Sequence, residues 1–359
     1  MQVLALVPSI YDTSPGQRYR IEQWQGGLRQ SGVEITFAAF EDKNLNTVLY
    51  ARKQWLRKGV GIGHAFLRRL STISQSKSYD LVYVFREASL LGPSVFERLI
   101  HFRHVPLVFD FDDAVFLPYR SPSNGWLSLL KAPRKTGTIC RLASQVMVGN
   151  NYLAEYARRF NPNVTVIPTT IDTEIYRVQP VRNATSPVIG WTGSYSTVQH
   201  LDLLRSTLSE LARREQFRVR VIGPPDYKLE GVDVEVVPWR SHTEVQDLAA
   251  VDIGIMPLPD NPWSRGKCGC KALQYMGLGI PAVCSPVGMN TDLIRDGENG
   301  FLANSAEEWM AKLTLLLRST ELRRRLGIAG RKTVEEGFSA TSQAPRVYAV
   351  FRSAIGASS

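Results

Sequence analysis

Cysteine is scarce in this sequence, and the marks of a secreted or membrane-spanning protein are missing. Four cysteines among 359 residues are too few for a disulfide framework. Cys268 and Cys270 do not have the spacing of a zinc knuckle, and the closest histidine is His242, so we expect free thiols and no metal site. No apolar run approaches the roughly 18 residues of a spanning helix. Residues 1–8 lack a basic start and predict a β-strand, not a signal peptide, which favours a cytoplasmic protein.

The composition excludes disorder and low complexity, because 44% of the residues are hydrophobic and 21% are charged. The chain is longer than one ordinary domain of about 100–200 residues, so two domains are expected. The net charge is +10. Its distribution is uneven.

Acidic residues are absent between Lys43 and Lys77. The basic residues there are Lys43, Arg52, Lys53, Arg57, Lys58, Arg68, Arg69 and Lys77. The apolar residues interleaved with them are Trp55, Leu56, Val60, Ile62, Phe66, Leu67 and Leu70. This combination is typical of a helix lying on an anionic membrane surface, and a solvated helical face is the alternative. Nucleic acid is not an expected partner, because no nucleic-acid module accompanies the charge.

Strand and helix patterns alternate along the chain, which predicts parallel sheets with crossover helices. Nearly continuous apolar runs at residues 3–7, 33–37, 81–84, 107–109, 146–148 and 164–167 suit strands buried on both faces. After a linker at 176–187, the pattern restarts with strands at 188–191, 219–222, 234–237, 253–256 and 282–284. The predicted fold is therefore α/β, with two Rossmann-like, doubly wound domains.

We place the first domain at residues 1–175 and the second at 186–336. Residues 337–359 form one more expected helix, which Pro345 can open and whose apolar stripe includes Val347, Val350 and Phe351. A helix that follows a completed sheet must pack elsewhere, and we expect it to pack back on the first domain.

Three carboxylates, Asp110, Asp112 and Asp113, follow the predicted strand at 107–109. Open α/β sheets bind ligands at the carboxyl ends of their strands. Three neighbouring acids repel one another unless a cation or hydrogen-bond donors accompany them. We expect these side chains to line a functional cleft; a helix cap with a loop cluster is the alternative.

The most specific stretch is residues 265–283, where a glycine-containing loop is followed by a short helix and a buried strand. At 100° per residue, Lys267, Lys271 and Gln274 fall within about 60° of one another. A helix N-terminus with glycines and two lysines suits a diphosphate. The alternative is a surface helix with incidental lysines.

Residues 266–283, the following Ser-Pro-Val-Gly at 285–288 and the Asp-Gly-Glu-Asn-Gly-Phe-Leu at 296–302 resemble the donor-site signature of retaining GT-B glycosyltransferases, the family 4 group. Residues 150–153 and 166–172 resemble that family's passage from the first domain to the second. The resemblance covers nearly the whole chain, closely from Val146 onward and loosely before it.

The resemblance implies two domains facing each other across a cleft, a nucleotide-sugar donor held by the second domain and an acceptor bound to the first. It implies transfer with retention and no metal requirement. The family's two glutamates correspond here to Gly266 and Gln274, and its phosphate-binding arginine and lysine correspond to Ser194 and Gln199. Its first-domain histidine maps approximately onto Asp112.

Three sets of candidate residues follow. Asp112 and Asp113 are the catalytic candidates, which would position the acceptor or stabilise an oxocarbenium-like sugar. The donor-binding candidates are Gly193, Ser194, Arg265, Lys267, Gly269, Lys271 and Gln274. The acceptor-side candidates are Gly16, Arg18 and Asp110.

The predicted function is transfer of a sugar from a nucleotide-diphosphate donor to a glycan or lipid-linked acceptor, without cofactor or metal. We expect a role in polysaccharide biosynthesis, in the cytoplasm or peripherally on the cytoplasmic face of an anionic membrane through residues 43–77. One alternative is a transferase in which Asp110 and Asp112 bind a metal. The others are a nucleotide-sugar epimerase and a non-catalytic sugar-nucleotide binding protein.

Overall fold

The computed structural model describes residues 1–49, 54–118, 132–178 and 186–356. The chain divides into two compact units, Met1–Thr169 with Gln343–Ser359, and Thr170–Ser342. The boundaries therefore fall a few residues from the expected positions at 175 and 337, and most of the expected linker at 176–187 lies outside the described residues. Within the part of the chain that the structure describes, no helix has the length and apolarity needed to cross a membrane.

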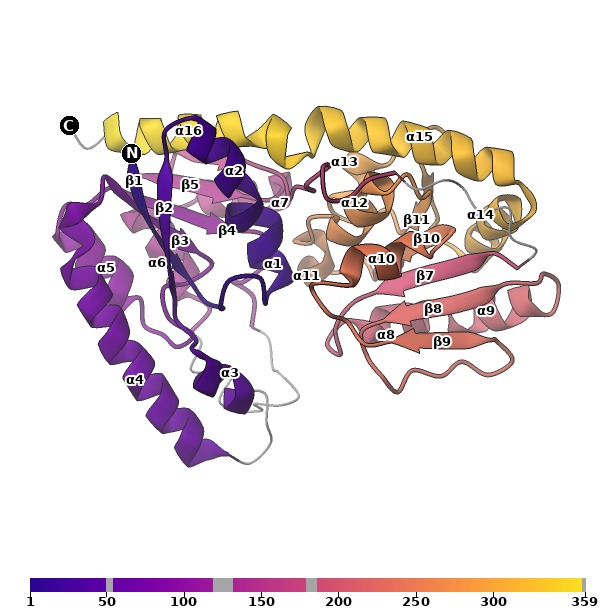
Figure 1. Ribbon diagram of the computed structural model, residues 1–359, viewed down its shortest axis with the longest axis horizontal. Coiled ribbons are helices and arrows are strands. Elements are labelled where there is room, and N and C mark those ends of the chain that lie inside the picture. The colour runs from indigo at the N-terminus through magenta and orange to yellow at the C-terminus, as the bar shows by residue number, and fades with distance from the viewer. Residues whose placement is uncertain (50–53, 119–131, 179–185, 357–359) are drawn as a thin grey trace. The chain divides into compact units, whose positions relative to one another are not determined.

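Each unit contains one six-stranded parallel sheet with helices packed on it (Figure 1). In the first unit the strand order is β2-β1-β3-β4-β5-β6. The strands are β1 (Gln2–Val7), β2 (Glu34–Ala39), β3 (Leu81–Phe85), β4 (Leu107–Phe111), β5 (Gln145–Val148) and β6 (Val164–Val166). Strands β3 and β4 are buried along their whole length, as their uninterrupted apolar sequences predict.

The helices of the first unit include a short turn of π-helix, η1 (Arg18–Glu22), between α1 and α2. The α-helices are α1 (Pro15–Gln17), α2 (Gln23–Gln30), α3 (Lys43–Leu49), α4 (Trp55–Ser74), α5 (Val95–Phe102), α6 (Lys135–Leu142) and α7 (Asn151–Arg158).

The last helix, α16 (Ala340–Gly356), joins the first unit from Gln343 onward. Gln145 Nε2 donates to Ser353 Oγ across 3.0 Å, and the rings of Tyr83 and Phe351 lie 5.9 Å apart. Phe351 belongs to the apolar stripe that the sequence places on this helix, so the stripe is buried in the first unit.

The second unit has the strand order β12-β11-β10-β7-β8-β9. Its strands are β7 (Val188–Thr192), β8 (Arg218–Ile222), β9 (Val234–Val237), β10 (Ile253–Met256), β11 (Ala282–Cys284) and β12 (Phe301–Leu302). Its helices are α8 (Val198–Leu201), α9 (Arg205–Ala212), α10 (Glu244–Ala249), α11 (Pro262–Arg265), α12 (Cys270–Gly277), α13 (Asn290–Leu293), α14 (Ala306–Arg318) and α15 (Thr320–Gly337).

The core of the second unit lies where α9 and α14 pack on the sheet, with Leu208 and Leu211 of α9 and Leu313 and Leu316 of α14 fully buried in one cluster. The predicted α/β class with two doubly wound sheets is confirmed. All four cysteines are free thiols, also as expected.

Candidate active site

Residues from three strand ends meet at the carboxyl edge of the first sheet. Gly16 lies in α1 after β1, Arg86 follows β3 directly, and Asp112 and Asp113 follow β4. These strands are neighbours at the centre of the sheet. The segments that leave them therefore lie together, at the edge where open α/β sheets bind ligands.

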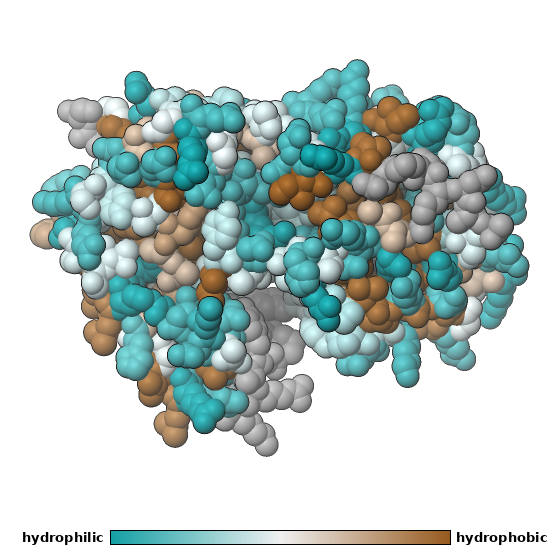
Figure 2. All heavy atoms as spheres, in the orientation of Figure 1, coloured by the Kyte–Doolittle hydropathy of each residue, from teal (hydrophilic) through white to brown (hydrophobic). Residues whose placement is uncertain are grey.

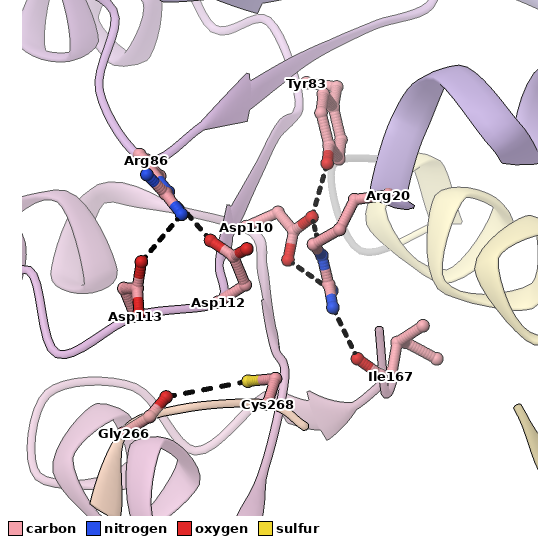
Figure 3. A network of polar contacts seen from close by, with 9 residues as sticks. All are labelled: Arg20, Tyr83, Arg86, Asp110, Asp112, Asp113, Ile167, Gly266 and Cys268. Atoms are coloured by element: carbon pink, nitrogen blue, oxygen red, sulfur yellow. Dashed lines mark hydrogen bonds and ion pairs between the residues drawn. The ribbon is translucent and has the colours of Figure 1, made fainter. Parts of the chain in front are cut away.

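Arg86 bridges the two catalytic candidates. Its Nε lies 2.7 Å from Oδ1 of Asp112, and its Nη2 lies 2.8 Å from Oδ2 of Asp113 (Figure 3). The side chain of Arg86 is 27% exposed, against 9% for Asp112 and 17% for Asp113. Burial alone would lower the pKa of Arg86, but the two carboxylates outweigh it and raise that pKa. The carboxylates thus have the cation that the sequence leads one to expect.

The backbone of Arg86 is in the left-handed region, with φ at +58°. Residues with a side chain rarely adopt it, and the cost is about 1–3 kcal/mol. The amide of Arg86 donates to the carbonyl of Asp110 across 2.6 Å. The turn therefore keeps the chain bonded to β4 while the guanidinium reaches the two carboxylates.

Gly16, an acceptor-side candidate, packs directly against this group. A Cβ at Gly16 would lie 2.7 Å from Nη2 of Arg86 and 3.2 Å from Oδ2 of Asp112, so a side chain there would displace them. Arg18, the next candidate, forms an ion pair with Asp12 through Nε and Oδ1 at 2.7 Å. The structure thus brings Gly16 to the carboxylates and pairs Arg18 with a different acid.

Asp110 has a structural role, and its expected contact with an acceptor is wrong. Its carboxylate is wholly enclosed and accepts hydrogen bonds from Nε and Nη2 of Arg20 at 2.7 and 2.6 Å and from the hydroxyl of Tyr83. Burial raises the pKa of Asp110, while Arg20 acts in the opposite direction. Arg20 also donates to the carbonyl of Ile167 across 2.7 Å. An enclosed carboxylate cannot touch a substrate, so Asp110 serves to tie η1 to the end of β4.

In the second unit, the donor-binding candidates from Arg265 to Gln274 lie in α11, in α12 or in the segment between them. The helix α12 begins at Cys270, and its N-cap Gly269 has φ at +70°, which glycine adopts without strain. Lys267 therefore precedes the helix. The expected face shared by Lys267, Lys271 and Gln274 is not formed, because the left-handed turn at Gly269 ends the helical path between the two lysines.

The two lysines nevertheless act on a common residue, His200 in α8. Burial, and after it the charges of Lys271 and Lys267, lower the pKa of His200 to about 4. Lys267 Nζ lies 5.4 Å from the ring centroid of Trp263, and Lys271 Nζ lies 5.6 Å from that of Trp191. This region of the second unit is thus electropositive.

Arg265 carries less of that charge, because its guanidinium forms an exposed pair with Asp260, Nε to Oδ1 at 2.7 Å. Figure 3 includes a further contact of this segment, from Cys268 Sγ to the carbonyl of Gly266 at 3.6 Å. Gly266 is one of the positions where the resemblance implies a glutamate. It contributes its backbone carbonyl to this contact.

Gly193 and Ser194 follow β7 in an uncharged loop. The amide of Gly193 donates to the carbonyl of Ile222 across 3.0 Å, and a Cβ at Gly223 would lie only 1.8 Å from the carbonyl oxygen of Gly193. The glycine at 223 thus permits the ends of β7 and β8 to approach. Ser194 Oγ lies 2.8 Å from Ser196 Oγ, and Gln199 donates to the carbonyl of Ser196.

Gln274 lies inside the second unit. Its Nε2 donates to Oε1 of Glu244 across 3.0 Å, and Trp239 Nε1 donates to the same oxygen across 2.9 Å. The hydroxyl of Tyr176 donates to the other oxygen, Oε2, across 3.2 Å. Both Gln274 and Glu244 are buried, so the amide expected to contact a ribose is engaged by protein groups.

The apolar half of the expected membrane-binding segment is exposed on α4. Leu56, Val60 and Leu67 are 87%, 61% and 66% exposed, and their spacing places them along one side of the helix. In Figure 2, hydrophobic side chains gather at lower left, in the region where α4 lies.

Fewer basic side chains of that segment are exposed than the sequence predicts. Lys58 and Arg69 are buried, and Arg69 donates to the carbonyls of Ala38 and Val7 at the ends of β2 and β1. Arg68 pairs with Asp42 at 2.8 Å. Arg52 and Lys53 lie outside the described residues. Several of the expected membrane-facing charges therefore hold the fold together.

Three residues escaped the sequence analysis: Arg86, His200 and Glu244. Arg86 had a usable signal, since it directly follows a predicted strand, as the aspartates do. His200 and Glu244 had none, because Lys267 and Lys271, which act on His200, and Gln274 and Tyr176, which bond Glu244, are distant from them in sequence. Across the described residues, no group of three or more His, Cys, Asp or Glu side chains is arranged to hold a metal ion.

Residues 186–319 match the family described as glycosyl transferases group 1. No curated protein matches the sequence. The matched residues contain the whole electropositive region of the second unit.

Several solved structures share the fold over nearly the whole chain. Sucrose-phosphate synthase (tll1590) from Thermosynechococcus elongatus has a TM-score of 0.72 at 16% identity, covering 99% of this chain and 100% of that one. Anabaena Alr3699/HepE in complex with UDP and glucose has a TM-score of 0.68 at 17% identity, covering 98% and 100%. The lipopolysaccharide outer core galactosyltransferase WaaB, in its apo form, has a TM-score of 0.62 at 15% identity, covering 98% and 99%. The fold is GT-B.

Proposed function

We propose that this glycosyltransferase moves a hexose or related sugar from a nucleoside-diphosphate donor to a hydroxyl of a glycan or lipid-linked acceptor, with retention, as in the family 4 group. Two of the similar structures support a nucleotide-sugar donor, since HepE is described in complex with UDP and with UDP-glucose. WaaB, described as acting on the lipopolysaccharide outer core, supports a glycan acceptor and a role in polysaccharide biosynthesis.

The observation that carries this proposal is the separation of charge between the two candidate sites. Among the described residues, Lys267 and Lys271 bring positive charge to the second unit's site, whereas Asp112 and Asp113, which pair with Arg86, bring negative charge to the first unit's site. A diphosphate needs the first kind of surroundings. An acceptor hydroxyl and an electron-poor sugar need the second kind.

In the proposed reaction, the bond from the sugar's C1 to the phosphate oxygen breaks and a bond from C1 to the acceptor oxygen forms. The nucleoside diphosphate leaves with the bonding electrons. Lys267, Lys271 and the N-terminus of α12 would stabilise that charge as it develops. Asp112 or Asp113 would orient the acceptor hydroxyl, whose proton passes to the departing nucleoside diphosphate, or would stabilise the positive charge on the sugar.

We expect catalysis without a metal ion or other cofactor. In the first unit, Arg20 and Arg86 already pair with Asp110 and Asp112, the two carboxylates that a metal-dependent alternative would use. Full turnover in the presence of a chelator is the expected result. Loss of turnover that Mg²⁺ or Mn²⁺ restores would favour the metal-dependent alternative.

The experiment that tests the function has two steps. Nucleoside diphosphates are first screened by thermal shift, where a ligand at about 100 times its dissociation constant should stabilise the fold by roughly 2.7 kcal/mol. The matching nucleotide sugars are then followed for release of the diphosphate. Release supports a transferase. Interconversion of the nucleotide sugar without release would indicate an epimerase, and binding without turnover with any acceptor would indicate a binding protein.

We also propose that the protein lies peripherally on the cytoplasmic face of an anionic membrane through α4. The exposed stripe of Leu56, Val60 and Leu67 supports insertion between lipid headgroups, and the absence of acidic residues from 43 to 77 supports an anionic surface. A lipid-linked acceptor would be met at that surface.

A further inference from the structure

We propose that His200 is a further ligand of the donor's diphosphate: its imidazole takes up a proton from solvent when the diphosphate binds and donates a hydrogen bond to a phosphate oxygen. This inference rests on the proposed function, because it takes the diphosphate to bind beside Lys267 and Lys271. Neither the sequence motifs nor the comparisons single out His200. The proposal gives it a role in binding and makes donor affinity depend on pH.

The first argument is the place of His200 in the second unit. It lies in α8, which follows β7, whereas Lys267 and Lys271 follow β10. Strands β7 and β10 are parallel neighbours, so the segments that leave them start side by side at the carboxyl edge of the sheet. From β7 the chain adds β8 and β9 on one side, then crosses to β10, β11 and β12 on the other. The strand order therefore reverses between β7 and β10, where open α/β sheets bind their ligands.

The second argument is a continuous set of contacts from Lys271 to the helix that carries His200. Lys271 Nζ lies 5.6 Å from the ring centroid of Trp191. A Cβ at Gly193 would lie 2.5 Å from Cη2 of Trp191 and 2.7 Å from Oγ1 of Thr197, so glycine at this position lets the indole lie close to Thr197. Thr197 is the N-cap of α8, and its carbonyl accepts from the amide of His200 across 3.0 Å. Lys271 and His200 therefore belong to one packed group of residues.

The third argument is the hydrogen-bonding capacity of the imidazole. His200 is 8% exposed, and within the part of the chain that the structure describes no protein group forms a hydrogen bond with its ring. A neutral imidazole has one N–H donor and one acceptor nitrogen, and polar groups this deeply buried normally have partners. The unused donor lies near two lysines, so it suits a ligand that brings negatively charged acceptor oxygens.

The fourth argument is charge. Because burial and the charges of Lys271 and Lys267 lower the pKa of His200 to about 4, its imidazole is neutral at pH 7 in the protein alone. A diphosphate diester brings two negative charges, which offset the two lysines and favour protonation of the ring. Proton uptake on binding requires, by linkage, that affinity rises as the pH falls.

The next ionisable groups along the chain form pairs of their own. Asp202, in the 3-10 helix η4 (Asp202–Leu204), pairs with Nη2 of Arg205 at 2.7 Å. The hydroxyl of Tyr227 donates to Oδ1 of Asp202 across 3.3 Å. The charges that lower the pKa of His200 therefore come from the two lysines, which are the groups that a diphosphate would neutralise.

The first test measures binding of UDP-glucose to the wild-type protein, with ADP-glucose and GDP-mannose in its place if either stabilises the protein better. All three are diphosphate diesters, whose phosphates do not titrate between pH 5.5 and 8. If binding returns the pKa of His200 from about 4 to its usual value of about 6.5, affinity should rise about tenfold from pH 8 to pH 5.5. Calorimetry in two buffers of different ionisation enthalpy should show uptake of more than about half a proton at pH 6. Constant affinity without proton uptake would overturn the proposal.

His200→Gln assigns the proton to its site. Glutamine keeps a hydrogen-bond donor but does not titrate, so this variant should bind about tenfold more weakly than wild type at pH 5.5 and within about twofold at pH 8. Its proton uptake at pH 6 should be lost. His242→Gln, which changes an exposed histidine of the same unit, is the matched control and should behave as wild type. Proton uptake retained in His200→Gln would assign the proton to another group and overturn the inference.

A second measurement needs no nucleotide sugar. The labelled histidines of the wild-type protein are titrated by NMR in sodium sulfate and in sodium chloride of equal ionic strength. Sulfate carries two negative charges and does not titrate in this range. The histidine with a pKa of about 4 in chloride should rise above about 5 in sulfate, and it should be missing from His200→Gln or, if that variant does not fold, from His200→Asn.

The two measurements separate the inference from the proposed function. A rise in sulfate, without binding of any of the three nucleotide sugars, would count against the proposed donor and function and leave His200 as an anion ligand. An unchanged pKa of His200 in sulfate and with the nucleotide sugars would overturn the inference, whether or not the protein transfers a sugar.

Discussion

The side-chain amide of Gln274 donates to Oε1 of Glu244 across 3.0 Å, in the interior of the second unit. Glu244 also accepts from Trp239 and Tyr176. The carboxylate of Glu244 therefore favours a neutral hydrogen-bond donor at position 274. The glutamate that the family resemblance implies at that position would place a second carboxylate beside Glu244.

Gln274→Glu should accordingly destabilise the protein by about 3 kcal/mol at neutral pH, because it places an unpaired charge beside Glu244 in a buried site. Burial and the like charge raise the pKa of the introduced carboxyl in the folded state above its unfolded value. The variant should therefore be closest to wild type near pH 4 and lose stability as the pH rises.

Thermal unfolding of Gln274→Glu between pH 4 and 8 checks this, with the exposed substitution Gln216→Glu as control. Wild-type stability of Gln274→Glu at pH 8 would mean that the hydrogen bond from the side-chain amide of Gln274 to Glu244 is not needed for stability.

Lys267→Ala and Lys271→Ala should each weaken binding of the nucleoside diphosphate that the thermal-shift screen identifies, and should leave binding of the corresponding nucleoside nearly unchanged. A charged hydrogen bond to phosphate contributes about 1.5–3 kcal/mol, which corresponds to roughly 10- to 150-fold in affinity. Isothermal calorimetry with both ligands measures the difference. Lys332→Ala, an exposed lysine of α15, is the control.

The same lysine variants have an internal readout in His200. Removing Lys271 or Lys267 should raise the pKa of His200 from about 4 toward the usual value, since both charges lower it. Unchanged nucleoside-diphosphate affinity in both variants, with the His200 shift present, would place the diphosphate elsewhere in the second unit.

Asp112→Asn and Asp113→Asn should reduce kcat about 100-fold or more in at least one variant, as expected for a group that acts on the reacting atoms. Affinity for the nucleoside diphosphate should stay within about twofold, because these carboxylates belong to the first unit. Steady-state kinetics and calorimetry on the same preparations compare the two. Wild-type turnover in both variants would mean that the carboxylates have no role in catalysis and only stabilise the loop.

Leu56→Ser with Leu67→Ser should release the protein from anionic vesicles. Burying each leucine in lipid contributes about 1.5–3 kcal/mol, so the double variant should lose at least about 100-fold in partitioning. Sedimentation with anionic and neutral vesicles measures it, and Leu315→Ser, an exposed leucine of α14, is the control. Equal recovery of the wild-type protein on both kinds of vesicle would remove the anionic-membrane proposal.

The sequence was sufficient for the sheets and for the place of Asp112 and Asp113, because apolar runs mark buried parallel strands and ligands bind where those strands end. It was insufficient where a residue's role depends on a distant partner. The enclosure of Asp110 depends on Arg20, which precedes it by 90 residues, and that of Gln274 on Glu244. The left-handed turn at Gly269 separates Lys267 from α12. No pattern in the sequence shows that the helix begins only after this turn.

Proton NMR of the reaction as it proceeds shows whether the sugar is transferred from a nucleotide donor and whether its anomeric configuration is retained. A panel of α-linked nucleotide hexoses, including UDP-glucose, is incubated with the wild-type protein, and the anomeric proton of the first-formed product is observed before mutarotation. Transfer with retention predicts release of the nucleoside diphosphate together with an α-configured product. A β-configured first product would contradict retention, and a panel left intact with every acceptor tried would contradict glycosyl transfer itself.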